Sequence, residues 1–425
     1  MHSTHLSRRQ ALQFAAGGSA GALLAAAYRE RVAAVTGRST ERRPGAADSG
    51  TAGSIQFEQI GVYDVDRLNE VLTTELAEFS EFAISFPPAQ YAVKLYRVTY
   101  PSVVPEKNNR PTTASGLIAI PDNDATTLPV VAYQHGSVFG KDEVPSNPDQ
   151  SMETRLMLAM FAGQGYMVIG ADYFGKGVSP EPNSYIVKAS TQQACLDMLF
   201  ATQLVCPELG VELGPLFISG WSQGGWSAFT YLYKLESVGI PVTAAAVASG
   251  PVDLYAIVNR WIHAPQPIDA SYIAPLMILM FNAFEQYYGL PGFANTAIKP
   301  EYQEVAGKLY RNEMTIDEAE PELPDHLPDL LQEEFMAATS IGQDRYSRLL
   351  QESHAYRWRA VTPMRVYYGG IDEVTPAYIA QMPVGYQQVM GGAPVTAVDA
   401  GPKADHRGTF LFGMQDQKQW FDQLL

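Results

Sequence analysis

Leu216-Phe217-Ile218-Ser219-Gly220-Trp221-Ser222-Gln223-Gly224-Gly225 is the stretch that decides the fold of this 425-residue chain. Residues 216–220 form a short apolar run, which is typical of a strand buried on both faces. Residues 225–236 then have the apolar spacing of a helix. Glycines two positions either side of Ser222 permit a sharp strand-to-helix turn, because a Cβ there would collide with the tight backbone. The stretch therefore predicts a nucleophile elbow that exposes Ser222, and the alternative is a plain glycine-rich turn.

Further strands and helices are predicted on both sides of this turn. Short apolar runs predict strands at residues 94–100, 116–120, 128–133, 166–171, 242–249, 364–368 and 395–398. Helical spacing is present at residues 152–162, 189–205 and 409–425. Strands that alternate with helices in this way predict an α/β fold, with a mostly parallel sheet and helices on both faces.

Residues 251–360 interrupt the alternation, because no clear strand pattern occurs there. We expect a helical cap inserted into a core built from residues 55–250 and 361–425. The cap carries a Met-rich apolar run at 271–284 and aromatic residues at Tyr287, Tyr288 and Phe293. These side chains form either the core of the cap itself or the lining of an apolar substrate pocket.

The first residues have the features of an export signal. Ser7-Arg8-Arg9-Gln10-Ala11-Leu12-Gln13-Phe14 resembles a twin-arginine motif, and residues 11–27 are Ala/Gly-rich and weakly apolar. A spanning helix needs about 20 strongly apolar residues, so residues 1–27 fit a cleavable twin-arginine-type signal better than an anchor. We expect an exported protein, periplasmic or extracellular, without an integral membrane span in its mature form. Residues 28–54, rich in Arg, Ala, Gly and Ser, are expected to be a disordered linker.

Charge and cysteine content exclude other classes of protein. The net charge of −16 argues against nucleic acid as a partner. Cys195 and Cys206 fall in one predicted segment of helix, which separates their Cα atoms by roughly 16 Å, too far for a disulfide. We expect both to be free thiols. They also lack the neighbouring ligands of a metal site, and none is expected.

A serine on such a turn is followed along the chain by an acid and then by a histidine base. Of the seven histidines, only His406 lies beyond the last predicted strand. Asp372 lies just beyond the strand at 364–368, where its carboxylate would fix the tautomer of His406 and stabilise the imidazolium. Glu373, Asp399 and Asp405 are the competing acids.

An oxyanion formed at Ser222 needs two backbone donors. The first is the N–H of Gln223 at the start of its helix, where the helix dipole also helps. The second is expected from Gly136 or Ser137, in the loop after the strand at 128–133. His135 precedes Ser222 in the chain, so we interpret it as a residue that shapes the loop.

Several short motifs together resemble the α/β-hydrolases and, more narrowly, the secretory-lipase-type esterases, which carry a helical cap between the sixth and seventh strands. They are His135-Gly136, Gly170-Ala171-Asp172-Tyr173-Phe174-Gly175-Lys176-Gly177, residues 220–225, Gly369-Gly370-Ile371-Asp372-Glu373-Val374-Thr375-Pro376 and Asp405-His406.

The resemblance covers about residues 94–425. It implies a Ser222–Asp372–His406 triad, acyl-enzyme chemistry on a small-molecule, lipid or polymer ester, and no cofactor. The cap does not match residue by residue, so substrate preference does not carry over. The Gly224-Gly225 doublet also occurs in prolyl-oligopeptidase-like peptidases. A serine peptidase or amidase, and a non-catalytic binding protein of the same fold, therefore remain alternatives.

Overall fold

The computed structural model describes residues 54–425. The predicted export signal and all but the last residue of the predicted linker lie outside this range. Within it, none of the helices combines the length and the hydropathy that a bilayer-spanning segment needs.

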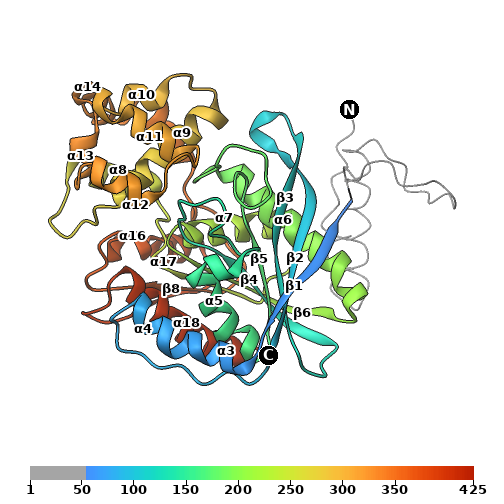
Figure 1. Ribbon diagram of the computed structural model, residues 1–425. Coiled ribbons are helices and arrows are strands. Elements are labelled where there is room, and N and C mark those ends of the chain that lie inside the picture. The colour runs from blue at the N-terminus through green and yellow to red at the C-terminus, as the bar shows by residue number, and fades with distance from the viewer. Residues whose placement is uncertain (1–53) are drawn as a thin grey trace, which may run out of the picture.

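The described residues form one nine-stranded sheet with the order β1-β2-β3-β5-β4-β6-β7-β8-β9 (Figure 1). From β5 to β9 every neighbouring pair is parallel, whereas β1, β2 and β3 pair antiparallel and β3 joins β5 antiparallel. The predicted mostly parallel sheet is confirmed. The strands are β1 (Gln56–Tyr63), β2 (Val93–Val104), β3 (Arg110–Pro121), β4 (Thr127–Gln134), β5 (Met167–Ala171), β6 (Glu212–Trp221), β7 (Ala244–Ala248), β8 (Met364–Tyr368) and β9 (Val395–Asp399).

Helices cover both faces of the sheet, as predicted. One face packs against α6 (Lys188–Val205) and α7 (Gln223–Ser237), and the other against α5 (Met152–Met160) and α18 (His406–Asp422). Helices approach the alanine-rich strand β7 closely from both sides. On one face, a Cβ on Gly225 of α7 would lie 2.7 Å from Val247 Cγ1. On the opposite face a Cβ on Gly413 of α18 would lie 3.2 Å from Ala248 Cβ. Two short helices, α16 (Ala377–Ala380) and α17 (Met382–Met390), connect β8 to β9.

The cysteines behave as predicted. Cys195 lies within α6 and Cys206 immediately follows it, and both are buried and free.

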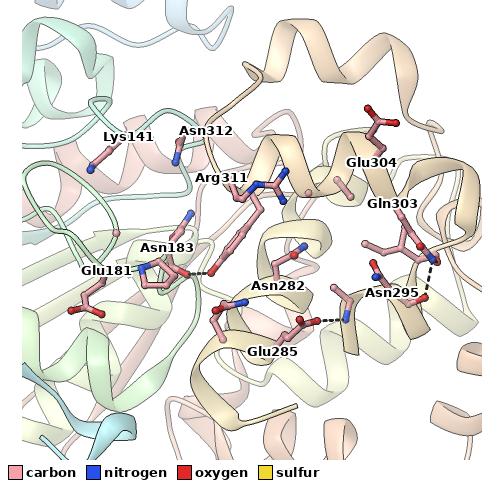
Figure 2. A pocket seen from close by; sticks show the side chains of 18 of the residues that line it. Lys141, Glu181, Asn183, Asn282, Glu285, Asn295, Gln303, Glu304, Arg311 and Asn312 are labelled. Carbon is pink, nitrogen blue, oxygen red and sulfur yellow. Dashed lines mark hydrogen bonds between the residues drawn. The ribbon is translucent and has the colours of Figure 1, made fainter. Parts of the chain in front are cut away.

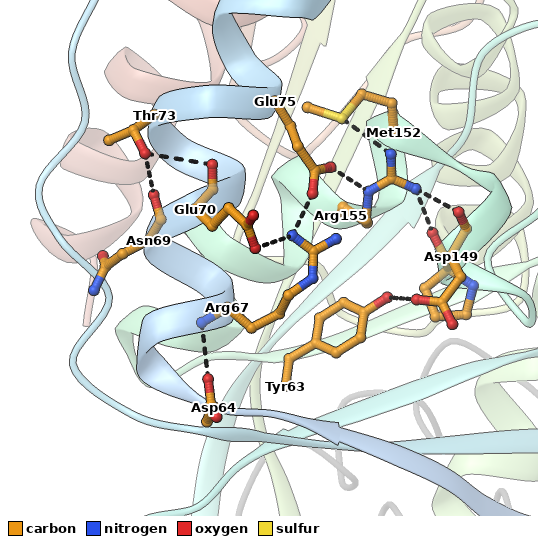
Figure 3. A network of polar contacts seen from close by, with 11 residues as sticks. Tyr63, Asp64, Arg67, Asn69, Glu70, Thr73, Glu75, Asp149, Met152 and Arg155 are labelled. Atoms are coloured by element: carbon orange, nitrogen blue, oxygen red, sulfur yellow. Dashed lines mark hydrogen bonds and ion pairs between the residues drawn. The ribbon is translucent and has the colours of Figure 1, made fainter.

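An N-terminal segment that the sequence did not predict packs beside α5. It consists of β1, α3 (Val65–Glu70), a π-helical turn (Val71–Glu75) and α4 (Leu76–Phe79). Figure 3 shows how charged groups join it to the core: Glu75 accepts hydrogen bonds from Arg67 and from Arg155 of α5, the latter at 2.6 Å. Its last helix reaches α18, where Arg407 Nη1 donates to the carbonyl oxygen of Phe79 at 2.8 Å.

The connection between β7 and β8 is mostly helical and forms the predicted cap, the yellow and orange lobe of Figure 1. Its helices are α8 (Leu254–His263), α9 (Ile273–Tyr288), α10 (Phe293–Ala297), α11 (Gln303–Tyr310), α12 (Ile316–Ala319), α13 (Leu327–Leu330), α14 (Glu333–Thr339) and α15 (Arg345–Glu352). The Met-rich run belongs to α9 and is buried inside the cap. The Phe281 ring lies 5.4 to 5.8 Å from the rings of Phe293, Phe335 and Tyr346. These side chains therefore form the core of the cap itself, the first of the two expected roles.

The two ends of the cap meet at a neck, formed by Val252 and Asp253 on the outgoing side and residues 353–358 on the returning side. The N–H of Ala355 donates to the carbonyl oxygen of Val252 at 2.8 Å. Tyr356 Oη and Arg357 Nη2 both donate to Asp253 Oδ2, at 3.0 and 2.5 Å. Asp253 is almost fully buried, so the neck is fixed by charged as well as backbone hydrogen bonds.

Candidate active site

Ser222 stands between the end of β6 and the start of α7, at the carboxyl edge of the sheet. Its backbone angles are φ 56° and ψ −125°, a region that side chains other than glycine's rarely adopt. The flanking glycines are sterically required: a Cβ on Gly220 would lie 2.1 Å from the carbonyl oxygen of Gly224. A Cβ on Gly224 would lie 1.9 Å from the carbonyl oxygen of Gln134. The chain therefore makes the strained, glycine-dependent turn that the motif predicts.

His406 and Asp372 form a buried pair at the same edge of the sheet. Asp372 follows β8, and its Oδ1 lies 2.9 Å from His406 Nδ1. The same oxygen accepts the N–H groups of Val374 and Thr375 at 3.0 and 2.8 Å, which hold the carboxylate in place. His406 is the first residue of α18, whereas the sequence placed it in a loop before a helix at 409. The imidazole is therefore carried by the first turn of a helix.

Each competing acid has another role. Asp405 is the N-cap of α18 and accepts the Gly408 N–H at 2.6 Å. Glu373 accepts the backbone N–H of His406 at 3.0 Å, and Asp399 accepts the N–H of Gly401 at 2.8 Å. Asp372 is the acid that contacts the imidazole.

The two buried groups stabilise each other's charged forms. Burial by itself lowers the pKa of His406, but the charge and hydrogen bond of Asp372 outweigh it, and the pKa of His406 rises above its ordinary value. Burial by itself raises the pKa of Asp372, but His406 and the hydrogen bonds to the carboxylate lower it below the ordinary range. Asp372 is therefore suited to remain ionised while His406 takes up a proton.

Trp221 connects the serine turn to the histidine. Its indole ring lies 5.0 Å from the His406 imidazole, and its Nε1 donates to the carbonyl oxygen of His406 at 3.0 Å. Phe410 of α18 stacks on the same indole at 4.8 Å. Among the described residues no hydrogen bond joins Ser222 Oγ to His406 Nε2. Such bonds often shorten only when a substrate binds.

The candidate N–H donors of the expected oxyanion hole differ in whether they already have an acceptor. The N–H of Gly136 donates to both carboxylate oxygens of Glu153, at 2.9 and 3.1 Å, so it is already engaged. Within residues 54–425, no acceptor contacts the N–H of Ser137 or of Gln223. Of the two loop candidates, Ser137 is therefore the one whose N–H lacks an acceptor among the described residues.

Glu153 is a residue of this site that sequence reasoning missed. It lies in the first turn of α5 and is only 8% exposed, and burial raises its pKa to about 8. A Cβ on Gly136 would lie 3.0 Å from Glu153 Oε2 and 3.3 Å from the Trp221 ring, so the three residues are tightly packed. An acidic residue in a first helical turn is common and carries no signal of such a role.

His135 shapes the loop, as interpreted from the sequence. Its ring stacks on Tyr173 with centroids 4.2 Å apart, and its nitrogens lie 2.8 and 3.3 Å from the carbonyl oxygens of Gly136 and Asp172. Burial lowers its pKa to about 4, so the imidazole is neutral near pH 7.

A pocket of about 950 Å³ lies between cap helices α9 to α11 and the core segment 175–183 (Figure 2). Its lining is mainly polar and includes Glu181, Asn183, Asn282, Glu285, Asn295, Gln303, Glu304, Arg311 and Asn312. Ser222, Asp372 and His406 do not line it. This pocket is therefore not the apolar pocket that the Met-rich run could have lined.

Comparisons with known proteins agree on the fold. No protein-family model and no curated protein matches the chain. Among solved structures, a Legionella pneumophila protein superimposes with a TM-score of 0.77 at 22% identity, over 87% of this chain and 97% of the other. The rice cell wall degrading esterase LipA of Xanthomonas oryzae gives 0.72 at 21% identity, over 86% and 95%. Candida antarctica lipase A in its closed state gives 0.62 at 15% identity, over 86% and 81%. At this level of identity the likeness establishes the fold.

Proposed function

We propose that this chain, which has the α/β-hydrolase fold, is a carboxylic ester hydrolase that works through an acyl-enzyme on Ser222. The observation that carries the proposal is the strained Ser222 turn at the same sheet edge as the buried His406–Asp372 pair. Two of the similar structures are named as an esterase and a lipase, which supports ester chemistry.

In the first step, His406 Nε2 takes the proton of Ser222 as Oγ attacks the ester carbonyl. Asp372 holds Nδ1–H, so the basic lone pair is on Nε2, and it stabilises the imidazolium that forms. The N–H groups of Gln223 and Ser137 receive the negative charge that develops on the carbonyl oxygen.

Next, the imidazolium of His406 gives its proton to the leaving alcohol as the C–O bond of the ester breaks. The acyl group remains on Ser222. Water then enters, His406 removes one of its protons, and the resulting hydroxyl attacks the acyl carbon. The bond between the acyl carbon and Ser222 Oγ then breaks, the carboxylic acid leaves, and the proton passes from His406 to Oγ.

The test uses p-nitrophenyl esters and a fluorophosphonate probe. Ser222→Ala should lower kcat by roughly 10⁶-fold and abolish labelling. Ser237→Ala is the matched control, because Ser237 is an exposed serine at the far end of the same helix. A Ser222→Ala protein with native activity would refute the proposal.

The same two assays separate the alternatives. A peptidase or amidase would hydrolyse p-nitroanilides faster than the matching esters, and a non-catalytic binding protein would resist the probe. The Gly224-Gly225 doublet does not favour a peptidase, because close packing alone accounts for a glycine at position 225. A Cβ on Gly225 would lie 2.8 Å from the Cα of Gly250 as well as against β7.

We also propose that residues 1–27 direct export through a twin-arginine pathway. Replacing both Arg8 and Arg9 by lysine should keep the protein in the cytoplasm of its host, as judged by cell fractionation. Export that is unaffected by the double replacement would contradict this.

A further inference from the structure

A second pocket, of about 240 Å³, lies at the neck where the cap returns to the core. We call it the neck pocket. Its lining is Lys188, Thr230, Tyr233, His354, Ala355, Arg357 and Trp358. Three of these seven side chains are basic and none is acidic, in a chain whose net charge is −16. Such a local concentration of basic groups needs an explanation.

Lys188, the first residue of α6, provides the strongest observation. Its Nζ donates to the carbonyl oxygens of Glu352, the last residue of α15, and of His354 in the neck, at 3.2 and 2.6 Å. An ammonium has three N–H donors, so one remains after these two bonds. No ion pair within residues 54–425 involves Lys188, and burial lowers its pKa to about 8. A largely buried cation without a carboxylate partner is costly unless an anion is supplied.

His354 adds a directed donor. Its Nδ1 accepts the backbone N–H of Arg357 at 3.3 Å, so the neutral ring carries its proton on Nε2. Burial, and next the charges of Lys188 and Arg357, lower the pKa of His354 to about 4. The ring is therefore a neutral N–H donor near pH 7.

Arg357 contributes a second cation. Its Nη2 donates to Asp253 and its Nε to Tyr356 Oη, which uses two of the five N–H groups of the guanidinium. Glu236 is occupied by the indole N–H of Trp358 and the backbone N–H groups of Val361 and Thr362. Glu106 is occupied by the backbone N–H and the hydroxyl of Ser190, two residues after Lys188. Among the described residues, no carboxylate forms an ion pair with Lys188.

We propose that the neck pocket binds a small oxyanion, either inorganic phosphate or the carboxylate of a small organic acid. Lys188, His354 and Arg357 supply the N–H donors, and Tyr233 and Trp358 form aromatic walls. Because Lys188 belongs to the core and the other two donors to the neck, a bound anion bridges the core and the base of the cap.

Isothermal titration calorimetry tests the proposal with potassium phosphate in one arm and sodium acetate in the other, against potassium and sodium chloride at equal ionic strength. We expect saturable binding in at least one arm, weakened about tenfold or more by Lys188→Met, since a charged hydrogen bond is lost. Lys299→Met is the matched control, because Lys299 also donates to a backbone carbonyl, that of Asp329, but lies outside the neck pocket. It should bind like the native protein.

Phosphate binding alone identifies an inorganic oxyanion, and acetate binding alone identifies a carboxylate; either result supports the site. Heats no larger than those of chloride in both arms, or native affinity in Lys188→Met, would overturn it. If circular dichroism shows that Lys188→Met does not fold, His354→Gln takes its place. That variant should bind several-fold more weakly, through loss of the Nε2 donor from its position, and unchanged affinity would overturn the proposal.

Discussion

Replacing Ser222 by glycine should give a more stable protein than replacing it by alanine, although both variants lose the proposed nucleophile. At φ 56° and ψ −125° a side chain other than glycine's costs about 1–3 kcal/mol of backbone strain. Glycine loses about 0.5–1 kcal/mol more conformational entropy on folding than alanine does. The difference in the free energy of unfolding is therefore about 0–2.5 kcal/mol in favour of Ser222→Gly. The loss of the hydroxyl group cancels, because both variants lack it.

Urea unfolding followed by circular dichroism measures this difference as a shift in midpoint at constant slope. Ser237, the last residue of α7, provides the control pair because it is exposed and its backbone is helical. There the order should reverse, with Ser237→Ala more stable than Ser237→Gly by about 1 kcal/mol or less. If Ser222→Gly were also the less stable of its pair, the strain assigned to the serine turn would be wrong.

Three other substitutions test the site. Asp372→Asn should lower kcat for a p-nitrophenyl ester by about 10⁴-fold. It should also move the acid limb of kcat/KM to lower pH, because the carboxylate that raises the pKa of His406 is lost; an unmoved limb contradicts the pairing. Glu153→Ala should cost about 10²-fold in kcat by releasing Gly136 and its loop, while Glu153→Gln, which keeps an acceptor oxygen, should cost much less; equal losses would count against this. Gly224→Ala should lower the free energy of unfolding by about 3 kcal/mol or more, because its Cβ would lie 1.9 Å from a backbone oxygen; a native urea midpoint would show that the turn can relax.

The parallel part of the sheet could be predicted from the sequence because its strands are buried on both faces. A strand such as β5 is then a continuous apolar run, and its observed bounds, Met167–Ala171, lie within one residue of the predicted 166–171. The positions of Ser222, Asp372 and His406 followed from chain order, since each comes at the carboxyl end of a parallel strand and those ends share one edge.

Elements and contacts that depend on distant parts of the chain could not be predicted. β1 is an edge strand that is mostly not buried, so its sequence lacks a clear pattern. Whether Gly136 or Ser137 keeps a free N–H depends on Glu153, 17 positions from Gly136 and on another element. His406 begins a helix rather than ending a loop because Asp405 caps it, and a capping aspartate looks the same in sequence as a competing catalytic acid.

The hydrogen bond between Val252 and Ala355 has a consequence for how the cap can vary among chains of this fold. The cap, an insertion of some hundred residues, leaves the core and returns to it at one point. Its length therefore does not constrain the distance between the two strands that it links. Its length and sequence can drift, or be exchanged for those of another lineage, while the register of β7 with β8 stays as it is. The cap can then change in sequence without disturbing the sheet edge that carries Ser222, Asp372 and His406.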